Sequence, residues 1–210
     1  MQKLQFLAAI LVLSGATLIG TSGLKAEDEP AARRVCLLFE GLFESPEVAQ
    51  PLQGAKLTQL VPFYEWDYGI RSFDEDYWTE NQFTWERITA ISKRVADGLL
   101  EKIRPDVIRD ERGIVDYVII HDKDPFLTSI LLSDKLLEKF KDTLGDQIYA
   151  ICIDRNLVYL FPGTGGRLDE YGPSLVDEFR QTPLPVSLEI FLIDSDGYRV
   201  FGELERDPAG

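Results

Sequence analysis

The chain has 210 residues, of which 45% are hydrophobic and 28% are charged, and its formal net charge at pH 7 is −14. These proportions are close to those of globular proteins, so one domain of ordinary size is expected and wholesale disorder is not. The acidic balance opposes binding to nucleic acid and to anionic membrane surfaces. We therefore expect a partner of another class.

Residues 1–26 have the layout of a secretory signal peptide. Lys3 precedes an apolar stretch from Leu4 to Gly20, small residues follow, and no acidic residue occurs before Glu27. The stretch of 17 residues is short for a bilayer span and is interrupted by polar and small residues. An exported protein, periplasmic or secreted, is therefore predicted, with an uncleaved N-terminal anchor as the alternative.

Cleavage of this signal is expected after Ala26, and a cut after Ser22 or Gly23 is the alternative. Removing residues 1–26 takes away two lysines and no acid, so the net charge would move from −14 to −16. The mature chain, residues 27–210, is predicted to be a single α+β domain with no membrane span.

The next residues predict alternating strands and helices. A strand is expected at 34–39, a loop at 44–56, and mostly irregular chain around a short strand at 57–61. Thr84 can cap a helix that Pro105 ends, and Ser133 can cap another that stops at Gly145. Between them lie a strand at 115–122 and the stretch "DPFLTSILL", which is either a helical turn or extended.

Two hairpins and a third helix complete the chain. "IYAICIDRNLVYLF" is expected to form two strands around a tight turn, and "VSLEIFLIDSDGYRVFGELE" forms another pair around Asp-Gly. Pro173 suits the first position of a helix that runs to residue 181. Hairpins interspersed with helices favour an α+β fold, a largely antiparallel sheet with helices packed on one face, over a doubly wound parallel sheet.

The loop "PGTGGR" after a predicted strand raises the question of phosphate binding. A P-loop needs GxxxxGK[ST], and the dinucleotide fingerprint needs a third glycine, but this loop has neither. An anion site would use Gly163, Gly165, Gly166 and Arg167. We favour a simple turn, because Asp169 and Glu170 would oppose an anion there.

The sequence "HDKD" holds the one His of the chain, at the end of a predicted strand. His121, Asp122 and Asp124 could bind a metal or perform acid–base catalysis, as in a metal-dependent hydrolase. The alternative is a surface His in a turn before Pro125. Two other Asp-x-Asp pairs, at 74/76 and 194/196, carry less weight, because the second is explained by its hairpin turn.

Aromatic residues alternate with acids in "YEWDYGIRSFDEDYWTENQFTWE". Aromatic faces and carboxylates are typical of carbohydrate sites, so Trp66, Trp78 and Trp85 could form one. Packing under a long loop is the favoured interpretation. Cys36 and Cys152 could form a disulfide in an oxidising compartment or could be two separately buried thiols.

From Val115 to Phe161 the chain has a strand, a Ser-x-Leu-Leu run, a helix, Gly-Asp, an apolar strand, an Asp-Arg turn and another strand. This order resembles part of the YtpQ-like family of uncharacterised bacterial proteins. The resemblance implies no established activity and supplies no functional residues.

Together these observations favour an exported, acidic, non-catalytic module that binds a protein or another component of the cell envelope or the exterior. A hydrolase using His121 and a carbohydrate-binding module are the alternatives. The sequence identifies no cofactor.

Overall fold

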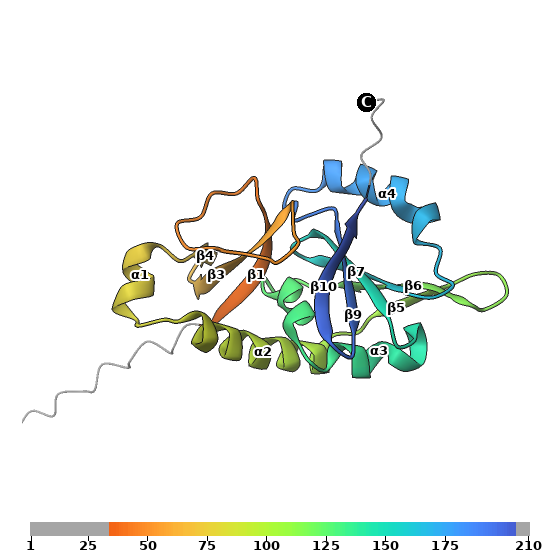
Figure 1. Ribbon diagram of the computed structural model, residues 1–210, viewed down its shortest axis with the longest axis horizontal. Helices are drawn as coiled ribbons and strands as arrows, with labels where there is room; N and C mark the ends of the chain where they lie inside the picture. The colour runs from red at the N-terminus through yellow and green to blue at the C-terminus, as the bar shows by residue number, and fades with distance from the viewer. Residues whose placement is uncertain (1–33, 205–210) are drawn as a thin grey trace, which may run out of the picture. The chain divides into compact units, whose positions relative to one another are not determined.

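The computed structural model describes residues 34–204, which belong to one compact unit. The predicted signal peptide, residues 1–26, lies outside this described part. Two sheets with antiparallel pairing form the framework (Figure 1). The small sheet has the order β1-β3-β2, with β4 also paired to β3, and the large sheet has the order β10-β9-β7-β8-β6-β5. The strands of the small sheet are β1 (Val35–Gly41), β2 (Gln50–Pro51), β3 (Thr58–Trp66) and β4 (Gly69–Ser72).

The large sheet is built from three hairpins, each joined by a short turn. Its strands are β5 (Asp106–Arg109), β6 (Val115–His121), β7 (Ile148–Asp154), β8 (Leu157–Pro162), β9 (Glu189–Asp194) and β10 (Gly197–Glu203). The helices are α1 (Glu75–Glu80), α2 (Trp85–Lys102), the 3-10 helix η1 (Leu127–Leu132), α3 (Leu136–Leu144) and α4 (Leu168–Gln181). The α+β class and the antiparallel pairing predicted from the sequence are confirmed.

The sequence predicts helices on one face of the sheet. In the structure they are divided between the two faces of the large sheet. In Figure 1, α4 lies above the large sheet while α2 and α3 lie below it. The strand β7 explains this arrangement, because side chains on both of its faces are buried. Ile148, Ala150 and Cys152 join the core that contains η1 and α3, whereas Ile151 and Ile153 join the core under α4. A strand that is apolar on both faces needs cover on both.

Two of the predicted helix ends, at Thr84 and Gly145, follow their capping signals. The Thr84 hydroxyl accepts a hydrogen bond from the Arg87 N–H at 3.2 Å, as an N-cap residue does. Gly145 ends α3 with a φ of +91°, a backbone conformation that suits glycine. Ser133 does not cap α3 as predicted, because the helix begins at Leu136 with Lys135 at its N-cap and no side-chain cap hydrogen bond. The Ser133 hydroxyl instead accepts from the Lys135 N–H at 3.1 Å, in the turn before the helix.

Two segments differ from the sequence-based prediction. The stretch expected to be mostly irregular contains the nine-residue strand β3, the strand β4 and the helix α1, whose N-terminus is capped by Asp74. The third helix begins at Leu168, so Pro173 lies inside α4 and not at its first position. Proline lacks an N–H, so at the sixth residue it removes one helical hydrogen bond, the one to the Asp169 carbonyl, and the helix continues through it.

The two sheets meet through β1 and are joined by aromatic and charged contacts. Phe39 of β1 is fully buried and lies edge-on to Phe191 of β9 at 5.1 Å and to Tyr198 of β10 at 5.5 Å between ring centroids. The neighbouring Glu40 carboxylate accepts two hydrogen bonds from Arg155, from Nε at 2.7 Å and from Nη2 at 2.8 Å. Arg155 lies in the β7–β8 turn, so this ion pair connects the small sheet to the large one.

A second polar junction lies on β9. The buried Glu189 carboxylate accepts hydrogen bonds from the backbone N–H groups of Lys56 and Leu57, just before β3 begins. Beside it, the Thr58 hydroxyl lies 2.7 Å from the Ser187 hydroxyl. The loop before β3 is thereby held against the large sheet.

Candidate binding surface

Three side chains of β6 point toward α4 at every second position. Tyr117 and Ile119 pack against the core under α4, and His121 lines a hollow beside it. The residues between them, Val118 and Ile120, are buried in the core on the other face. This alternation is that of a strand with two covered faces. The two faces of β6 differ in burial, because the residues on the α4 side stay partly exposed while those on the other side are buried.

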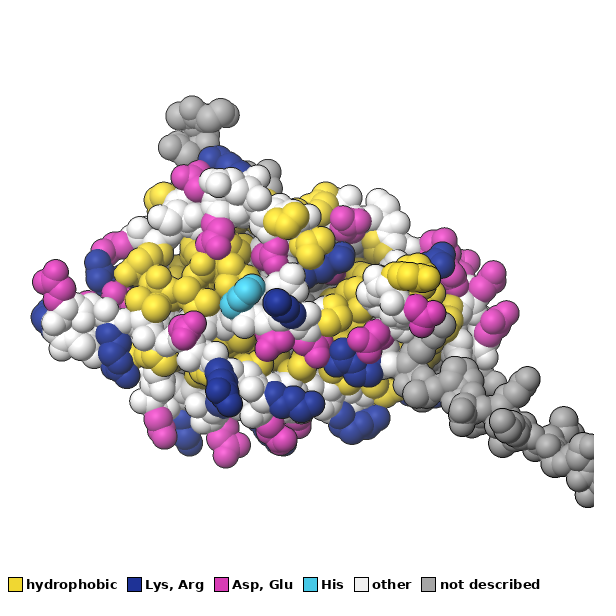
Figure 2. All heavy atoms as spheres, turned by 180° about the vertical axis from the view of Figure 1, so that it is seen from behind, with side chains coloured by type: hydrophobic (Ala, Val, Ile, Leu, Met, Phe, Trp, Pro, Cys, Tyr) yellow, Lys and Arg dark blue, Asp and Glu magenta, His cyan; other side chains and the backbone are white. Residues whose placement is uncertain are grey.

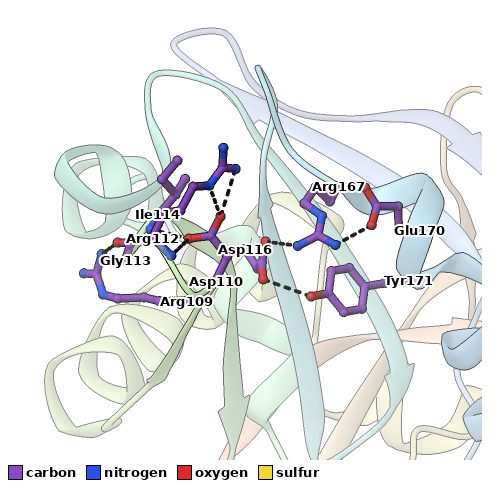
Figure 3. Close-up of polar contacts among 9 residues, drawn as sticks. All are labelled: Arg109, Asp110, Arg112, Gly113, Ile114, Asp116, Arg167, Glu170 and Tyr171. Carbon is purple, nitrogen blue, oxygen red and sulfur yellow. Dashed lines mark hydrogen bonds and ion pairs between the residues drawn. The ribbon is translucent and has the colours of Figure 1, made fainter.

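A β-bulge precedes this row. Ile108 pairs with Tyr117 and Arg109 pairs with Val115, so Asp116 is the extra residue of β6. In Figure 3 the buried Asp116 carboxylate lies between Arg167 and Tyr171. It accepts from Arg167 Nη1 at 3.1 Å and from the Tyr171 hydroxyl at 3.0 Å. Burial and this carboxylate raise the pKa of Tyr171.

The side of α4 that faces β6 and β8 is held by polar contacts along its length. Tyr171 binds Asp116 at the first turns, and Glu178 accepts a hydrogen bond from the Tyr159 hydroxyl at 2.7 Å. At the end of the helix, Thr182 donates to Asp154. The spacing from 171 to 178 and 182 keeps these groups on one side of a helix. Burial and the Glu178 carboxylate raise the pKa of Tyr159.

A hollow of about 350 Å³ opens between the end of α4 and the β7–β8 turn. It is lined by His121, Ile153, Asp154, Asn156, Leu157, Glu178, Gln181 and Thr182. Asp154 is nearly buried, and its Oδ1 also accepts the Asn156 N–H at 2.7 Å. The lining therefore combines two carboxylates, an imidazole and two amides with apolar walls.

Figure 2 shows a broad hydrophobic area on this side of the molecule, with the His side chain in cyan at its edge. The half-buried apolar residues that pack on the core under α4 include Tyr117, Ile119, Leu157 and Tyr171. We define the β6–α4 surface by these four residues together with His121 and Glu178. It joins an apolar strip to the polar hollow.

The structure does not bring His121, Asp122 and Asp124 together as a metal site. Within residues 34–204 no group of three or more His, Cys, Asp or Glu side chains could hold a metal ion. The Asp122 carboxylate accepts the Asp124 N–H at 2.8 Å, and Asp124 binds Arg34 Nη1 at 2.8 Å. His121 instead lines the hollow that Asp154 and Glu178 also line, on the side opposite to Asp122, because successive residues of a strand face opposite sides.

The glycine-rich loop is shaped by close backbone contacts. A Cβ at Gly163 would lie 2.7 Å from the Gln147 carbonyl oxygen, and one at Gly166 would lie 2.3 Å from the Pro162 oxygen. Gly165 has a φ of +70°. Arg167 is paired with Asp116 and Glu170, which lowers the pKa of Glu170. The loop thus joins β8 to α4, and its arginine already has two carboxylate partners.

The three tryptophans do not form one platform. Trp78 and Trp85 are in contact, with ring centroids 4.8 Å apart, whereas Trp66 packs against Tyr68. Other aromatic residues of this segment contact one another at and around α1, as in the stacked Tyr64–Tyr77 pair at 4.5 Å and the tilted Phe73–Phe83 pair at 4.9 Å. Most of the aromatic side chains therefore serve packing.

Both cysteines are fully buried and have free thiols in this structure, which corresponds to the second of the two predicted alternatives. Burial raises the pKa of Cys36 to about 11 and also raises that of Cys152. A thiol that holds its proton so firmly is a poor nucleophile.

The sequence grouped His121 with Asp122 and Asp124, whereas in the structure it lines a hollow with Asp154 and Glu178. Asp154 and Glu178 come from β7 and α4, and no local motif links them to His121. The alternation of β6 was the available signal, since it places Tyr117, Ile119 and His121 on one face.

Comparisons of this chain with protein-family models, with curated proteins and with solved structures find no match. The resemblance to the YtpQ-like family therefore stays a prediction. Among the helices of residues 34–204, none is long and apolar enough to cross a membrane.

Proposed function

We propose that this protein is an exported, non-catalytic binding module that receives a segment of a partner protein on the β6–α4 surface. One observation carries the proposal: a strip of half-exposed apolar side chains ends in a hollow with polar walls. Binding sites combine an apolar area with a few polar groups that fix the orientation of the ligand.

The two walls of the surface are firmly placed. The sheet supplies the row on β6, and α4 is held to it through Asp116, Glu178 and Thr182. A surface on a rigid helix and strand loses little conformational freedom on binding. A partner segment would therefore meet a preformed site.

The test is selection from a random peptide library displayed on phage, with the purified protein as the target. We expect enriched peptides whose affinity falls at least tenfold with Ile119→Ser, because serine removes apolar contact area from the centre of the strip. A tenfold loss corresponds to about 1.4 kcal/mol. The matched control is Ile114→Ser, which removes an isoleucine exposed at the tip of the β5–β6 hairpin, outside the surface.

Thermal unfolding of both variants would show that they fold. The proposal is wrong if no peptide is enriched, or if the enriched peptides bind Ile119→Ser as tightly as the unchanged protein.

Export is tested separately by the mass of the protein recovered from cells that express the full chain. We expect loss of residues 1–26, because the apolar stretch from Leu4 to Gly20 matches a cleavable signal. A mass that corresponds to cleavage after Ser22 or Gly23 would still support export and would change only the position of the cleavage site. An uncleaved chain recovered in the membrane fraction would support the anchor instead.

A further inference from the structure

We infer that the segment received by the β6–α4 surface is extended and basic, with a Lys or Arg side chain in the hollow and apolar residues on the strip. This inference rests on the proposed function, since it specifies the chemistry of the occupant.

The charge of the hollow favours a cation. Its lining includes the carboxylates of Asp154 and Glu178 and no lysine or arginine. Glu178 uses one oxygen, Oε2, for the Tyr159 hydroxyl at 2.7 Å. Charge-assisted hydrogen bonds from an ammonium or guanidinium group to such partly enclosed carboxylates are stronger than those between neutral groups.

The charge of the whole chain points the same way. A protein of net charge −14 repels acidic partners and a second copy of itself at long range, and attracts basic ones. A basic segment is therefore favoured both by the carboxylates of the hollow and by the negative charge of the whole protein. A neutral apolar segment would cover the strip but bring no counter-charge to the carboxylates of the hollow, which accept hydrogen bonds from neutral groups.

The geometry of β6 favours an extended occupant. Tyr117, Ile119 and His121 follow one another at every second residue, and a strand rises about 3.3 Å per residue, so the row is about 13 Å long. An extended segment laid along it carries side chains toward the protein at the same repeat of about 6.6 Å. The basic residue should therefore stand two or four positions from the apolar residues that contact Ile119 and Tyr117.

The test uses the peptides selected on the unchanged protein. We expect them to be enriched in Lys or Arg at an even spacing from aromatic or aliphatic residues. Replacing that basic residue by Gln should weaken binding at least tenfold. Glu178→Gln should weaken it by a similar factor, while its side chain can still accept the Tyr159 hydroxyl. Raising the salt concentration should weaken binding further, as screening predicts.

The matched control is Asp177→Asn, the same change of charge on the adjacent residue of α4. Asp177 pairs with Arg180 and lines a different hollow, so this variant should bind as the unchanged protein does. This inference would be wrong if the selected peptides lose affinity for Ile119→Ser but contain no basic residue, or bind Glu178→Gln as tightly as the unchanged protein. The proposed function would still hold in that case. If no peptide is enriched, both are wrong.

Discussion

Replacing Arg155 by alanine is expected to lower the free energy of unfolding by about 3–5 kcal/mol at neutral pH. The reason is the state of its partner: the Glu40 side chain is 1% exposed, while that of Arg155 is 23% exposed. Without the guanidinium, Glu40 keeps its charge inside the protein without a counter-charge. For a chain of this size, the melting temperature should fall by roughly 10 °C.

The loss should depend on pH with a definite sign. Burial raises the pKa of Glu40 above its usual value of 4.5, while the Arg155 guanidinium opposes that rise. A raised pKa means that the folded state holds this proton more tightly than the unfolded state does. The contribution of Glu40 to stability is therefore complete below pH 4.5 and is lost as the pH rises through the raised value.

Removing Arg155 raises the pKa of Glu40 further, so the deficit of Arg155→Ala should be smaller at pH 5 than at pH 8. Denaturant unfolding of both proteins at the two pH values measures this difference. The double variant Arg155→Ala with Glu40→Gln should recover part of the loss at pH 8, because no charge stays buried. Equal deficits at both pH values, or no recovery, would contradict the explanation.

Phe39→Ala is expected to cost about 3–5 kcal/mol, because it leaves a cavity where the small sheet meets the large one. Phe39 is 0% exposed and contacts both Phe191 and Tyr198 through edge-on ring pairs. Such pairs contribute about 0.5–1.5 kcal/mol each beyond the area that they bury.

Urea unfolding measures this loss as a lower midpoint with an unchanged slope. Phe43→Ala is the control, since that ring lies four residues further along the chain and is 58% exposed. Its cost should be within about 0.5 kcal/mol. Similar midpoints for the two variants would show that the junction of the sheets does not depend on Phe39.

Local signals in the sequence predicted much of the fold. Thr84, Gly145 and the Asp-Gly turn at 196–197 each mark an end that the structure confirms, because caps and turns depend on neighbouring residues. The helix α1 and the start of α4 were missed. The first is short and lies among aromatic residues with no clear period, and the second begins in a glycine loop before a proline.

The candidate surface was predicted less well, for a physical reason. Its polar groups come from β6, β7 and α4, and tertiary contacts alone bring His121 near Asp154 and Glu178. From the sequence alone His121 is associated with Asp122, the adjacent residue, which a strand directs to the opposite side. The division of the helices between two faces was also not predicted. The continuous apolar run of β7 indicates it, because a strand that is apolar on both faces needs cover on both.

The β-bulge at Asp116 has a consequence for how this protein can tolerate changes in length. Asp116 is an additional residue opposite the β5 strand, so its removal would restore regular pairing and leave Tyr117, Ile119 and His121 on the α4 side. The same deletion would remove the carboxylate that binds Arg167 and Tyr171. An insertion between Val118 and His121 would instead turn the end of the row into the other core. The spacing within the second half of β6 must therefore be kept if these three side chains are to stay on the α4 side.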